Sequence, residues 1–373
     1  MKIAIDARMY GKGYGIGRYV ESLVHGLEKT VSDISFVLYL KPESVNNYRQ
    51  AGGSFEVIEA PYHWYGLDEQ TKFLSLLNTG NHDLIHFPHW NIPVRYKRPF
   101  LVTIHDLTMF HFPRYEATTR SYPVFWVKDK IHRMVVRHAV HDAQAIIATS
   151  QFTAQDIISS LGVSQEKISV VYQSPNLMVE NNWEQVQKKF GLEHPYLLYV
   201  GAAYPHKNLK KLLDAWKQVS QNFVEYELIL AGSPSPFYVD IEKYIHTMNI
   251  PNVRLVGFVE DIYLNQLYHH ASAMVFPSLY EGFGLPPLEA ITAGVPVIAS
   301  HAGSLPEILG EAAYYVDPNN AAHIAQGISE VLGNEEIKME LKKAGRIQAS
   351  LFSEGQYIKN TLSVYKKALG ESN

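Results

Sequence analysis

The chain of 373 residues carries no cysteine, 19% charged residues and a formal net charge of −4. That length exceeds what one hydrophobic core usually serves, so we expect two domains. The lack of cysteine excludes disulfides, thiolate metal sites and a cysteine nucleophile, and it fits a reducing compartment. The net charge argues against a nucleic-acid partner, because binding to a phosphate backbone needs a basic surface.

The chain start and the apolar runs predict a protein that does not cross a membrane. A short apolar run at residues 3–5 is followed by Asp6, whereas a signal peptide needs a longer run. No apolar stretch of the sequence approaches the length of a membrane span. We therefore expect a cytoplasmic protein, either free or attached to the inner face of the cell membrane.

The first half of the chain alternates apolar runs with amphipathic segments. Helical periodicity predicts helices over residues 19–29 and 128–138, and the apolar runs predict buried strands over residues 2–6, 36–40, 84–86, 100–104 and 145–149. This alternation is typical of a parallel sheet covered by helices on both faces.

A second series of the same kind follows residues 172–190, whose polar composition is typical of a linker. It predicts strands over residues 196–200, 227–231, 253–256, 273–276 and 295–299, and helices over residues 209–220, 239–248, 262–270, 286–293 and 321–332. We therefore predict an α/β protein of two doubly wound, Rossmann-like domains, residues 1–175 and 176–352. Ligands of such sheets bind at the carboxyl ends of the strands, across the cleft between the domains.

The loop after the strand at residues 273–276 combines glycines, glutamates and a helix start. Gly282 and Gly284 let the backbone approach a ligand closely. The N–H groups and the dipole of the helix that follows favour an anion. Glu281 and Glu289 can grip the hydroxyls of a polyol at two points. The alternative is that both are solvated acids near a helix start.

Lys207 lies in the turn between the strand at residues 196–200 and a helix that Asn208 can cap. A lysine in that place can meet a phosphate as a point charge. A lone lysine in a polar turn is more often simply exposed. The same strand–turn–helix pattern as in the glutamate loop, within one domain, favours the phosphate.

In the first domain, His105 directly follows the strand at residues 100–104. It can donate to a sugar hydroxyl or take part in proton transfer, although a structural histidine is as common at such a position. The glycine-rich loop that includes Gly15 and Gly17 matches neither a Walker A loop nor a dinucleotide fingerprint. We expect it to be a mobile loop over the cleft.

The sequence argues against a metal and against a cofactor. No Asp-x-Asp pair occurs, whereas a magnesium-bridged diphosphate commonly needs such carboxylates. A zinc site is conceivable among neighbouring histidines, but no H-E-x-x-H spacing supports it: the residues are His82, His86, His89, His105 and His111. A bound diphosphate must then be neutralised by Lys207 and helix N-termini.

Residues 122–137 mix aromatic and aliphatic side chains with lysines and arginines. Such a helix can lie on an anionic membrane surface. The alternative is an ordinary amphipathic helix packed on the domain core.

Together these motifs resemble the retaining glycosyltransferases of family 4, which have the GT-B fold. The spacing of Glu281 and Glu289 is the most specific mark, and the resemblance covers nearly the whole chain. Residues 15–19 and 104–107 resemble the bacterial mannosyltransferase branch. The matching flanks are Tyr199-Val200-Gly201, Pro205-His206-Lys207-Asn208, Gly257-Phe258-Val259, Ala293-Gly294-Val295-Pro296-Val297 and Gly303-Ser304-Leu305-Pro306-Glu307.

For the second domain, the resemblance implies a nucleotide-sugar site. Glu289 holds the donor ribose, Glu281 contacts hydroxyls of the transferred sugar, and Lys207 neutralises the diphosphate. The backbone amides that bind the sugar and the diphosphate are those of Phe283, Gly284 and Leu285. Many family members have an arginine where this chain has Ala202 and a basic residue where it has His206.

For the first domain, the resemblance implies that His105 faces the sugar and that Gly15 and Gly17 belong to the donor site. The last helix, within residues 353–373, returns to this domain. Residues 62–65 and the loop at residues 11–17 are candidate contacts of the acceptor, because aromatic faces stack on sugars.

The implied activity is metal-independent, retaining hexosyl transfer in cell-surface polysaccharide or lipopolysaccharide synthesis. The implied donor is GDP-mannose, with a UDP-sugar as the alternative, and the acceptor is a saccharide or lipid-linked saccharide. A nucleotide-sugar epimerase or a sugar phosphorylase is a competing enzyme assignment. A two-domain sugar-binding protein is the non-enzymatic alternative, and slow hydrolysis of a nucleotide sugar would separate enzyme from binder.

Overall fold

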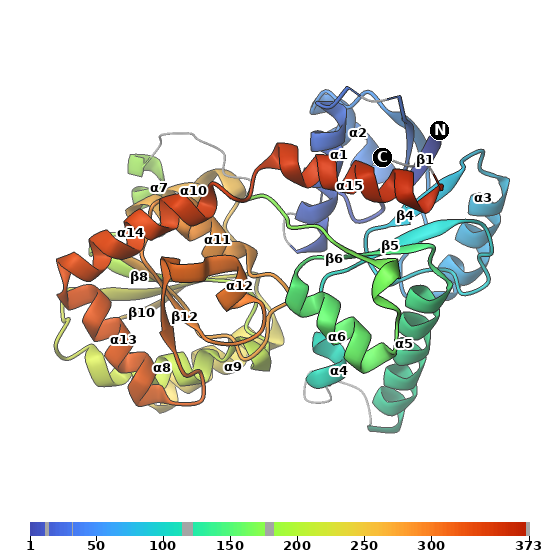
Figure 1. The fold of residues 1–373 in the computed structure, drawn as a ribbon. Coiled ribbons are helices and arrows are strands. Elements are labelled where there is room, and N and C mark those ends of the chain that lie inside the picture. Colours follow the sequence, from blue (N-terminus) through green and yellow to red (C-terminus); the bar gives the residue numbers. More distant parts are fainter. Residues whose placement is uncertain (12–14, 32, 114–121, 176–182, 371–373) are drawn as a thin grey trace. The chain divides into compact units, whose positions relative to one another are not determined.

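A computed structural model describes residues 1–11, 15–31, 33–113, 122–175 and 183–370 (Figure 1). The chain divides into two compact units. Unit 1 comprises Met1–Ser174 with Ser353–Asn373, and unit 2 comprises Pro175–Phe352. The last segment of the chain thus belongs with the first.

Unit 1 is built on a parallel sheet that has seven strands within the described residues, in the order β3-β2-β1-β4-β5-β6-β7. Every neighbouring pair is parallel. Its strands are β1 (Lys2–Asp6), β2 (Ser35–Leu40), β3 (Glu56–Glu59), β4 (Leu84–Phe87), β5 (Phe100–Ile104), β6 (Ala145–Ala148) and β7 (Ile168–Val170). Its helices are α1 (Ile16–Glu28), α2 (Pro42–Gln50), the π-helix Glu69–Phe73, α3 (Leu74–Thr79), α4 (Thr108–His111), α5 (Tyr122–Asp142), α6 (Gln151–Leu161) and α15 (Glu354–Ala368).

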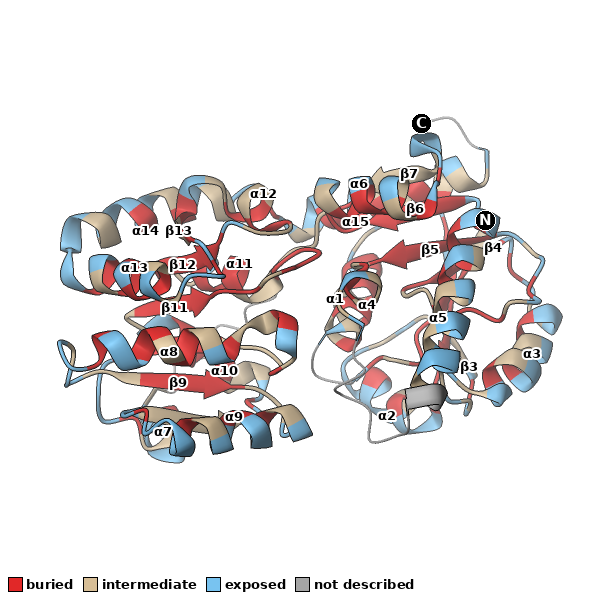
Figure 2. Cartoon of the chain, turned by 90° about the horizontal axis from the view of Figure 1, so that it is seen from below, coloured by how far each residue is buried: buried red, intermediate tan, exposed pale blue. Residues whose placement is uncertain are grey.

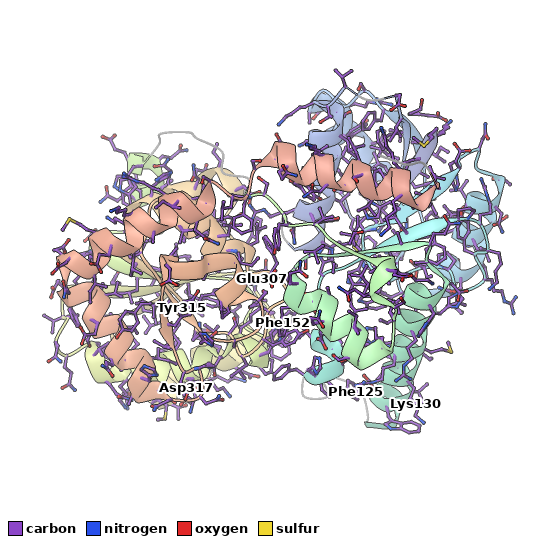
Figure 3. All side chains as sticks on the ribbon, viewed as in Figure 1. Phe125, Lys130, Phe152, Glu307, Tyr315 and Asp317 are labelled. Atoms are coloured by element: carbon purple, nitrogen blue, oxygen red, sulfur yellow. The ribbon has the colours of Figure 1, made fainter. Side chains whose placement is uncertain are left out.

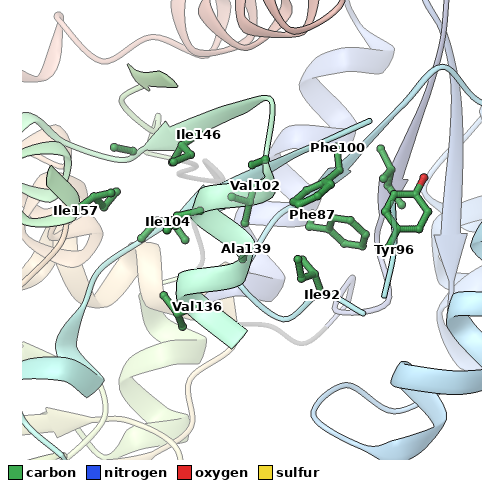
Figure 4. Packing of buried hydrophobic residues seen from close by; sticks show 14 of the residues in the cluster. Phe87, Ile92, Tyr96, Phe100, Val102, Ile104, Val136, Ala139, Ile146 and Ile157 are labelled. Carbon is green, nitrogen blue, oxygen red and sulfur yellow. The ribbon is translucent and has the colours of Figure 1, made fainter. Parts of the chain in front are cut away.

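Successive side chains of these strands point to opposite faces of the sheet and so belong to two hydrophobic clusters. On β5, Val102 and Ile104 join a cluster with residues of α5 and α6 (Figure 4), whereas Leu101 joins the other one. The second cluster also holds Tyr357 and Tyr365 of α15 together with α1 side chains. The returning helix is therefore part of the core of unit 1.

Unit 2 repeats this plan with a parallel sheet of six strands within the described residues, in the order β10-β9-β8-β11-β12-β13. Its strands are β8 (Tyr196–Val200), β9 (Glu227–Ala231), β10 (Val253–Gly257), β11 (Ala273–Phe276), β12 (Val297–Ser300) and β13 (Ala313–Val316). Its helices are α7 (Trp183–Phe190), the short 3₁₀ turn Pro205–Lys207, α8 (Leu209–Val219), α9 (Pro236–Thr247), α10 (Asp261–His270), α11 (Leu285–Thr292), α12 (Leu305–Leu309), α13 (Ala321–Gly333) and α14 (Glu335–Ala349).

The burial pattern follows the layers (Figure 2). Strands β11 and β12 are buried throughout, and helices such as α8 and α13 bury one face each. Several helices begin at a side-chain cap; Ser150, Ser235, Asn320 and Asn334 each accept an N–H of the first turn. The prediction of two doubly wound α/β sheets is confirmed.

Two details of the prediction were wrong. Residues 172–190 were expected to be a linker, but Trp183–Phe190 form α7; residues 176–182 lie outside the described part. Strands β3, β7 and β13 were not predicted. Each lies at the edge of its sheet and contains partly exposed positions, so none shows the continuous apolar run of a central strand.

Candidate active site

The sheet of unit 2 brings Lys207 and Glu281 together. Strands β8 and β11 are parallel neighbours, so the segments that follow them meet at one edge. Lys207 Nζ donates to both carboxylate oxygens of Glu281, at 2.6 and 2.8 Å. Both side chains keep some exposure, 18% and 11%. The sequence motifs predicted two ligand contacts here and did not predict that they form an ion pair with each other.

The glutamate loop ends at Gly284, whose backbone is left-handed with φ 92°. A Cβ at this residue would lie 2.6 Å from Leu305 Cδ2, so a larger residue would have to displace that side chain and adopt an unfavourable backbone conformation. Helix α11 begins at Leu285, one residue before the expected start. The two prolines that follow have no N–H, so Leu285 supplies the one amide proton of the first three helical positions. The Phe283 ring is buried edge-on against Phe352.

A second loop supports the Glu281 backbone. Gly303 has φ 60°, and a Cβ there would lie 2.7 Å from both the N and the O of Glu281. Ser304 N–H donates to the Glu281 carbonyl at 3.1 Å. The backbone of Glu281 is therefore held in place by packing and a hydrogen bond from the loop at Gly303 and Ser304.

Glu289 lies on α11 and is fully buried. Its Oε2 accepts a hydrogen bond from Tyr268 Oη of α10, at 3.0 Å. A buried carboxylate requires such a partner, because an unpaired one is costly to desolvate.

The turn that carries Lys207 differs from its prediction. Asn208 was expected to cap α8, but it adopts a left-handed backbone with φ 64° and makes no side-chain cap. Its Nδ2 instead donates to the carbonyls of Pro277 and Pro318, at 3.1 and 2.7 Å, and so ties three loops together. The ring of His206 is buried, 4% exposed, which disfavours its use as an accessible second cation in place of the arginine missing at Ala202.

In unit 1, His105 follows β5 and is half-buried. Its Nε2 lies 2.8 Å from the Pro88 carbonyl, which can accept but not donate, so Nε2 carries the proton and Nδ1 is an acceptor. Burial lowers the pKa of His105, although Pro88 and Asp106 oppose the shift. Tyr19 packs edge-on against the ring at 4.6 Å. Neutral His105 can thus accept a hydrogen bond through Nδ1 and does not supply a positive charge.

The same edge of unit 1 holds a buried ionic cluster that sequence reasoning missed. Arg8, 1% exposed, pairs with Asp6 through Nε and Nη2, both at 2.7 Å, and with Glu69 at 2.7 Å. Its guanidinium lies 3.7 Å from the Phe73 ring centroid. Burial lowers the pKa of Arg8, but the two carboxylates outweigh it and raise the pKa overall. An arginine two residues after the aspartate that ends β1 was the available signal.

The helix start near Gly15 and Gly17 has a glycine-specific geometry. Gly15 is the residue before α1, with φ 58° and ψ −127°, and no side chain caps the helix. Gly17 lies buried in the first turn. The expected mobile loop includes residues 12–14, which lie outside the described part of the chain.

The neighbouring histidines of unit 1 have separate partners. Within the described residues, no three histidine, aspartate or glutamate side chains are arranged to hold a metal ion. Their partners are Tyr96 for His82, Tyr365 and Thr103 for His86, Asn91 for His89, the Pro88 carbonyl for His105 and Asp156 for His111. Nothing in these contacts favours the zinc alternative.

Helix α5, on which Phe125 and Lys130 are labelled in Figure 3, leaves apolar side chains exposed. Trp126, Ile131 and Met134 are each at least half exposed, and Lys130 Nζ lies 3.6 Å from the Trp126 ring centroid. Among the described helices, none combines the length and the apolar character needed to cross a membrane.

Two family models match the chain in succession. Residues 14–174 match the model described as Glycosyltransferase Family 4, and residues 181–348 match Glycosyl transferases group 1. The O-antigen chain mannosyltransferase B of Escherichia coli is 30% identical over 295 residues, which is 76% of this chain and 74% of the relative. The O-antigen chain mannosyltransferase RfbU of Salmonella typhimurium is 28% identical over 263 residues, 70% of this chain and 68% of the relative.

Solved structures show the same architecture. Sucrose-phosphate synthase from Thermosynechococcus elongatus superposes with a TM-score of 0.78 at 20% sequence identity, and the match covers all of both chains. At that identity the likeness concerns the fold. The two Rossmann-like sheets are therefore those of the GT-B architecture.

Proposed function

This chain belongs to glycosyltransferase family 4 and is a glycosyltransferase, and we propose that it transfers mannose from GDP-mannose, with retention of configuration, to a saccharide or lipid-linked saccharide. The observation that carries the proposal is the Lys207–Glu281 pair beside the start of α11. A polyol-binding carboxylate and a phosphate-binding cation occupy one strand edge, which suits a sugar linked to a diphosphate.

Lys207 and the α11 start provide for the leaving group. Glu281 holds Nζ in place before a ligand arrives. A diphosphate that reaches Lys207 shares this cation with Glu281, while the Gly284 and Leu285 amides donate to its oxygens. As the bond from the anomeric carbon to the diphosphate breaks, negative charge builds on the departing oxygen, and these fixed donors stabilise it.

The remaining residues position the reacting groups. In this proposal Glu281 accepts hydrogen bonds from hydroxyls of the transferred sugar and Glu289 from the ribose. His105 accepts one through Nδ1. The acceptor oxygen bonds to the anomeric carbon on the face that the diphosphate leaves, and its proton passes to the departing diphosphate. The protein's contribution is position and charge rather than a covalent intermediate.

The donor and the stereochemistry can be tested together. The relatives' names, O-antigen chain mannosyltransferases, support mannose as the sugar and a surface polysaccharide as the product. Thermal-shift measurements with GDP-, UDP- and ADP-sugars should show the largest stabilisation with GDP-mannose. Proton NMR of the first product formed from α-linked GDP-mannose should show an α-mannoside. A β-mannoside would exclude retention. Stabilisation by a UDP-sugar alone would show that the donor is a UDP-sugar and not GDP-mannose.

We also propose that no metal ion is needed. The support is that the sequence lacks an Asp-x-Asp pair and that Lys207 supplies a cation at the proposed diphosphate position. Turnover measured with EDTA and with added magnesium should agree within about twofold. A loss of activity in EDTA that magnesium restores would contradict this part.

We propose further that α5 rests on an anionic lipid surface. Its exposed Trp126, Ile131 and Met134 accompany Lys128 and Arg137 on the same helix. Vesicles with and without phosphatidylglycerol, sedimented with the protein, should retain it when anionic lipid is present. The Trp126→Ser/Ile131→Ser variant should remain in solution, and equal retention of both proteins would contradict the proposal.

A further inference from the structure

Tyr65 has an uncommon backbone conformation for its residue type. Its φ is 63°, in the left-handed region that bulky residues rarely adopt, and its side chain is 54% exposed. Burial of the ring therefore does not explain the strain. Strain of this kind persists where surrounding structure imposes it, and it concentrates at functional positions.

The buried ionic cluster imposes this conformation. Tyr65 N–H donates to Glu69 Oε2 at 3.1 Å, and the other oxygen of Glu69 accepts from Arg8 at 2.7 Å and from Asn91 at 3.0 Å. Arg8 is held in turn by Asp6. Three buried charged groups are costly to desolvate. Here they fix the backbone that presents an exposed aromatic ring.

The ring of Tyr65 lies over Trp90, with centroids 5.0 Å apart and planes at 32°. Trp90 follows β4 and also contacts the rings of His89 at 4.7 Å and His132 at 4.3 Å. A cavity of about 10 Å³, room for one water molecule, shares His89 with this group and is lined by Asp6, Arg8, Met9, Ile16, Val20, Trp64, Pro88, His89 and Asn91. Aromatic faces and polar side chains thus adjoin at the carboxyl edge of the sheet.

The charges around this cavity are internally paired. Arg8 is bound by two carboxylates, and Lys41 lies over Trp64 at 4.3 Å and pairs with Glu43 at 3.7 Å. Burial also keeps the nearby histidines neutral, since it lowers the pKa of His89 well below its ordinary value and that of His132 to about 4. Such a surface suits an uncharged ligand better than a phosphate or a carboxylate.

We propose that the exposed ring of Tyr65, backed by Trp90, forms a stacking subsite for an uncharged sugar ring of the acceptor. This inference rests on the proposed glycosyl transfer. The acceptor sugar that binds here is a neutral hexose rather than an acidic or phosphorylated one. Tyr65 and Trp90 are then determinants of acceptor specificity.

Kinetics with mannotriose as the acceptor test this subsite. Tyr65→Asn removes the ring while keeping a residue that tolerates the left-handed backbone. We expect the KM for mannotriose to rise about tenfold, with the KM for GDP-mannose unchanged. Trp90→Ala should raise the KM for mannotriose in the same way. Tyr65→Phe, which keeps the ring, should have the KM of the original protein. Leu67→Ala, at an 85% exposed residue of the same segment, is the matched control and should change nothing.

A binding measurement separates this inference from the proposed reaction. Saturation-transfer NMR on the full chain without donor should show contact with mannotriose, weaker contact with mannose 6-phosphate, and loss of the mannotriose signal in Tyr65→Asn. That result supports the subsite even if GDP-mannose proves not to be the donor. Stronger binding of mannose 6-phosphate, or an unchanged mannotriose signal in Tyr65→Asn and Trp90→Ala, would overturn it.

Discussion

The carboxyl edges of the two sheets use charged side chains in different ways. In unit 2, Lys207 and Glu281 form a pair that remains partly exposed, on a 3₁₀ turn and a glycine loop. In unit 1, Arg8, Asp6 and Glu69 form a cluster with exposures of 6% or less, and the exposed Tyr65 is bonded to it. The same architecture thus yields one edge with a partly exposed ion pair and one with a buried ionic cluster.

This difference shows that the burial of a charged side chain decides whether it is available to a ligand. A partly exposed cation can be shared between its carboxylate and a phosphate at a lower desolvation cost than a fully buried one. A buried cluster cannot exchange its partners, because removal of one leaves the others uncompensated. The first arrangement suits binding of a charged donor, and the second suits holding a neutral platform in place.

Breaking the buried cluster should give the largest effect. Arg8→Met leaves Asp6 and Glu69 without a cation, so we expect a loss of about 3–5 kcal/mol in the free energy of unfolding. Urea unfolding followed by circular dichroism measures it. Arg95→Met, at an exposed arginine of the same unit, is the control and should change stability by less than about 0.5 kcal/mol. Equal effects in the two variants would show that the cluster is not structural.

Breaking the Lys207–Glu281 pair should instead affect catalysis. We expect Lys207→Ala to lower kcat about 10²- to 10³-fold, because a donor to the leaving group is lost. Its melting temperature should fall less than that of Arg8→Met, since the Lys207–Glu281 pair keeps more exposure than the cluster. Lys210→Ala, an exposed lysine on α8, serves as the control in the same transfer assay. Turnover that survives in Lys207→Ala would remove Lys207 from the mechanism.

Glu289 sharpens the comparison, because it is a buried carboxylate on the helix that follows the Lys207–Glu281 pair. Tyr268→Phe removes the hydroxyl that donates to it. A hydrogen bond to a charged group contributes about 1.5–3 kcal/mol, so we expect a loss of that order in stability. If Glu289 holds the ribose, the KM for the nucleotide sugar should change as well. Urea unfolding and donor kinetics on one preparation distinguish these two effects.

Acidification should weaken unit 1 through its neutral histidines. Burial lowers the pKa of His86 from 6.5 to about 3, whereas the unfolded chain keeps an ordinary value. The contribution of neutral, buried His86 to the free energy of unfolding is therefore present above pH 6.5. It is lost as the pH falls toward 3, by about 1.4 kcal/mol per pH unit. Urea unfolding between pH 7.5 and 5 should show this slope. His86→Gln should reduce the slope, and His63→Gln, at an exposed histidine, should leave it unchanged.

The sequence predicted the central strands and one edge strand, β10, and missed the edge strands β3, β7 and β13. Strands such as β5 and β8 are buried, almost completely in the case of β8, and are mostly apolar, so their bounds were predicted to the residue. The short edge strands β3 and β13 mix polar or aromatic residues with apolar ones, because part of each is exposed. A residue pattern reports burial more directly than it reports strand pairing.

The candidate site divides in the same way. Motifs predicted Lys207 and Glu281 because they lie in turns after strands, and Glu289 because it lies on the helix that follows the glutamate loop. They did not predict the Lys207–Glu281 pair, since contact between loops 74 positions apart follows from strand order. The role of Glu69 was equally hidden, because it depends on a π-helix folding against Arg8. Long-range pairing of charges is a property of topology that one sequence does not display.

The position of the donor diphosphate is the central claim, and a crystal structure with GDP-mannose tests it most directly. The proposal predicts phosphate oxygens within hydrogen-bond distance of Lys207 Nζ and of the Gly284 and Leu285 amides, with the mannose beside Glu281. Nucleotide bound elsewhere in unit 2, with the Lys207–Glu281 pair undisturbed, would contradict it.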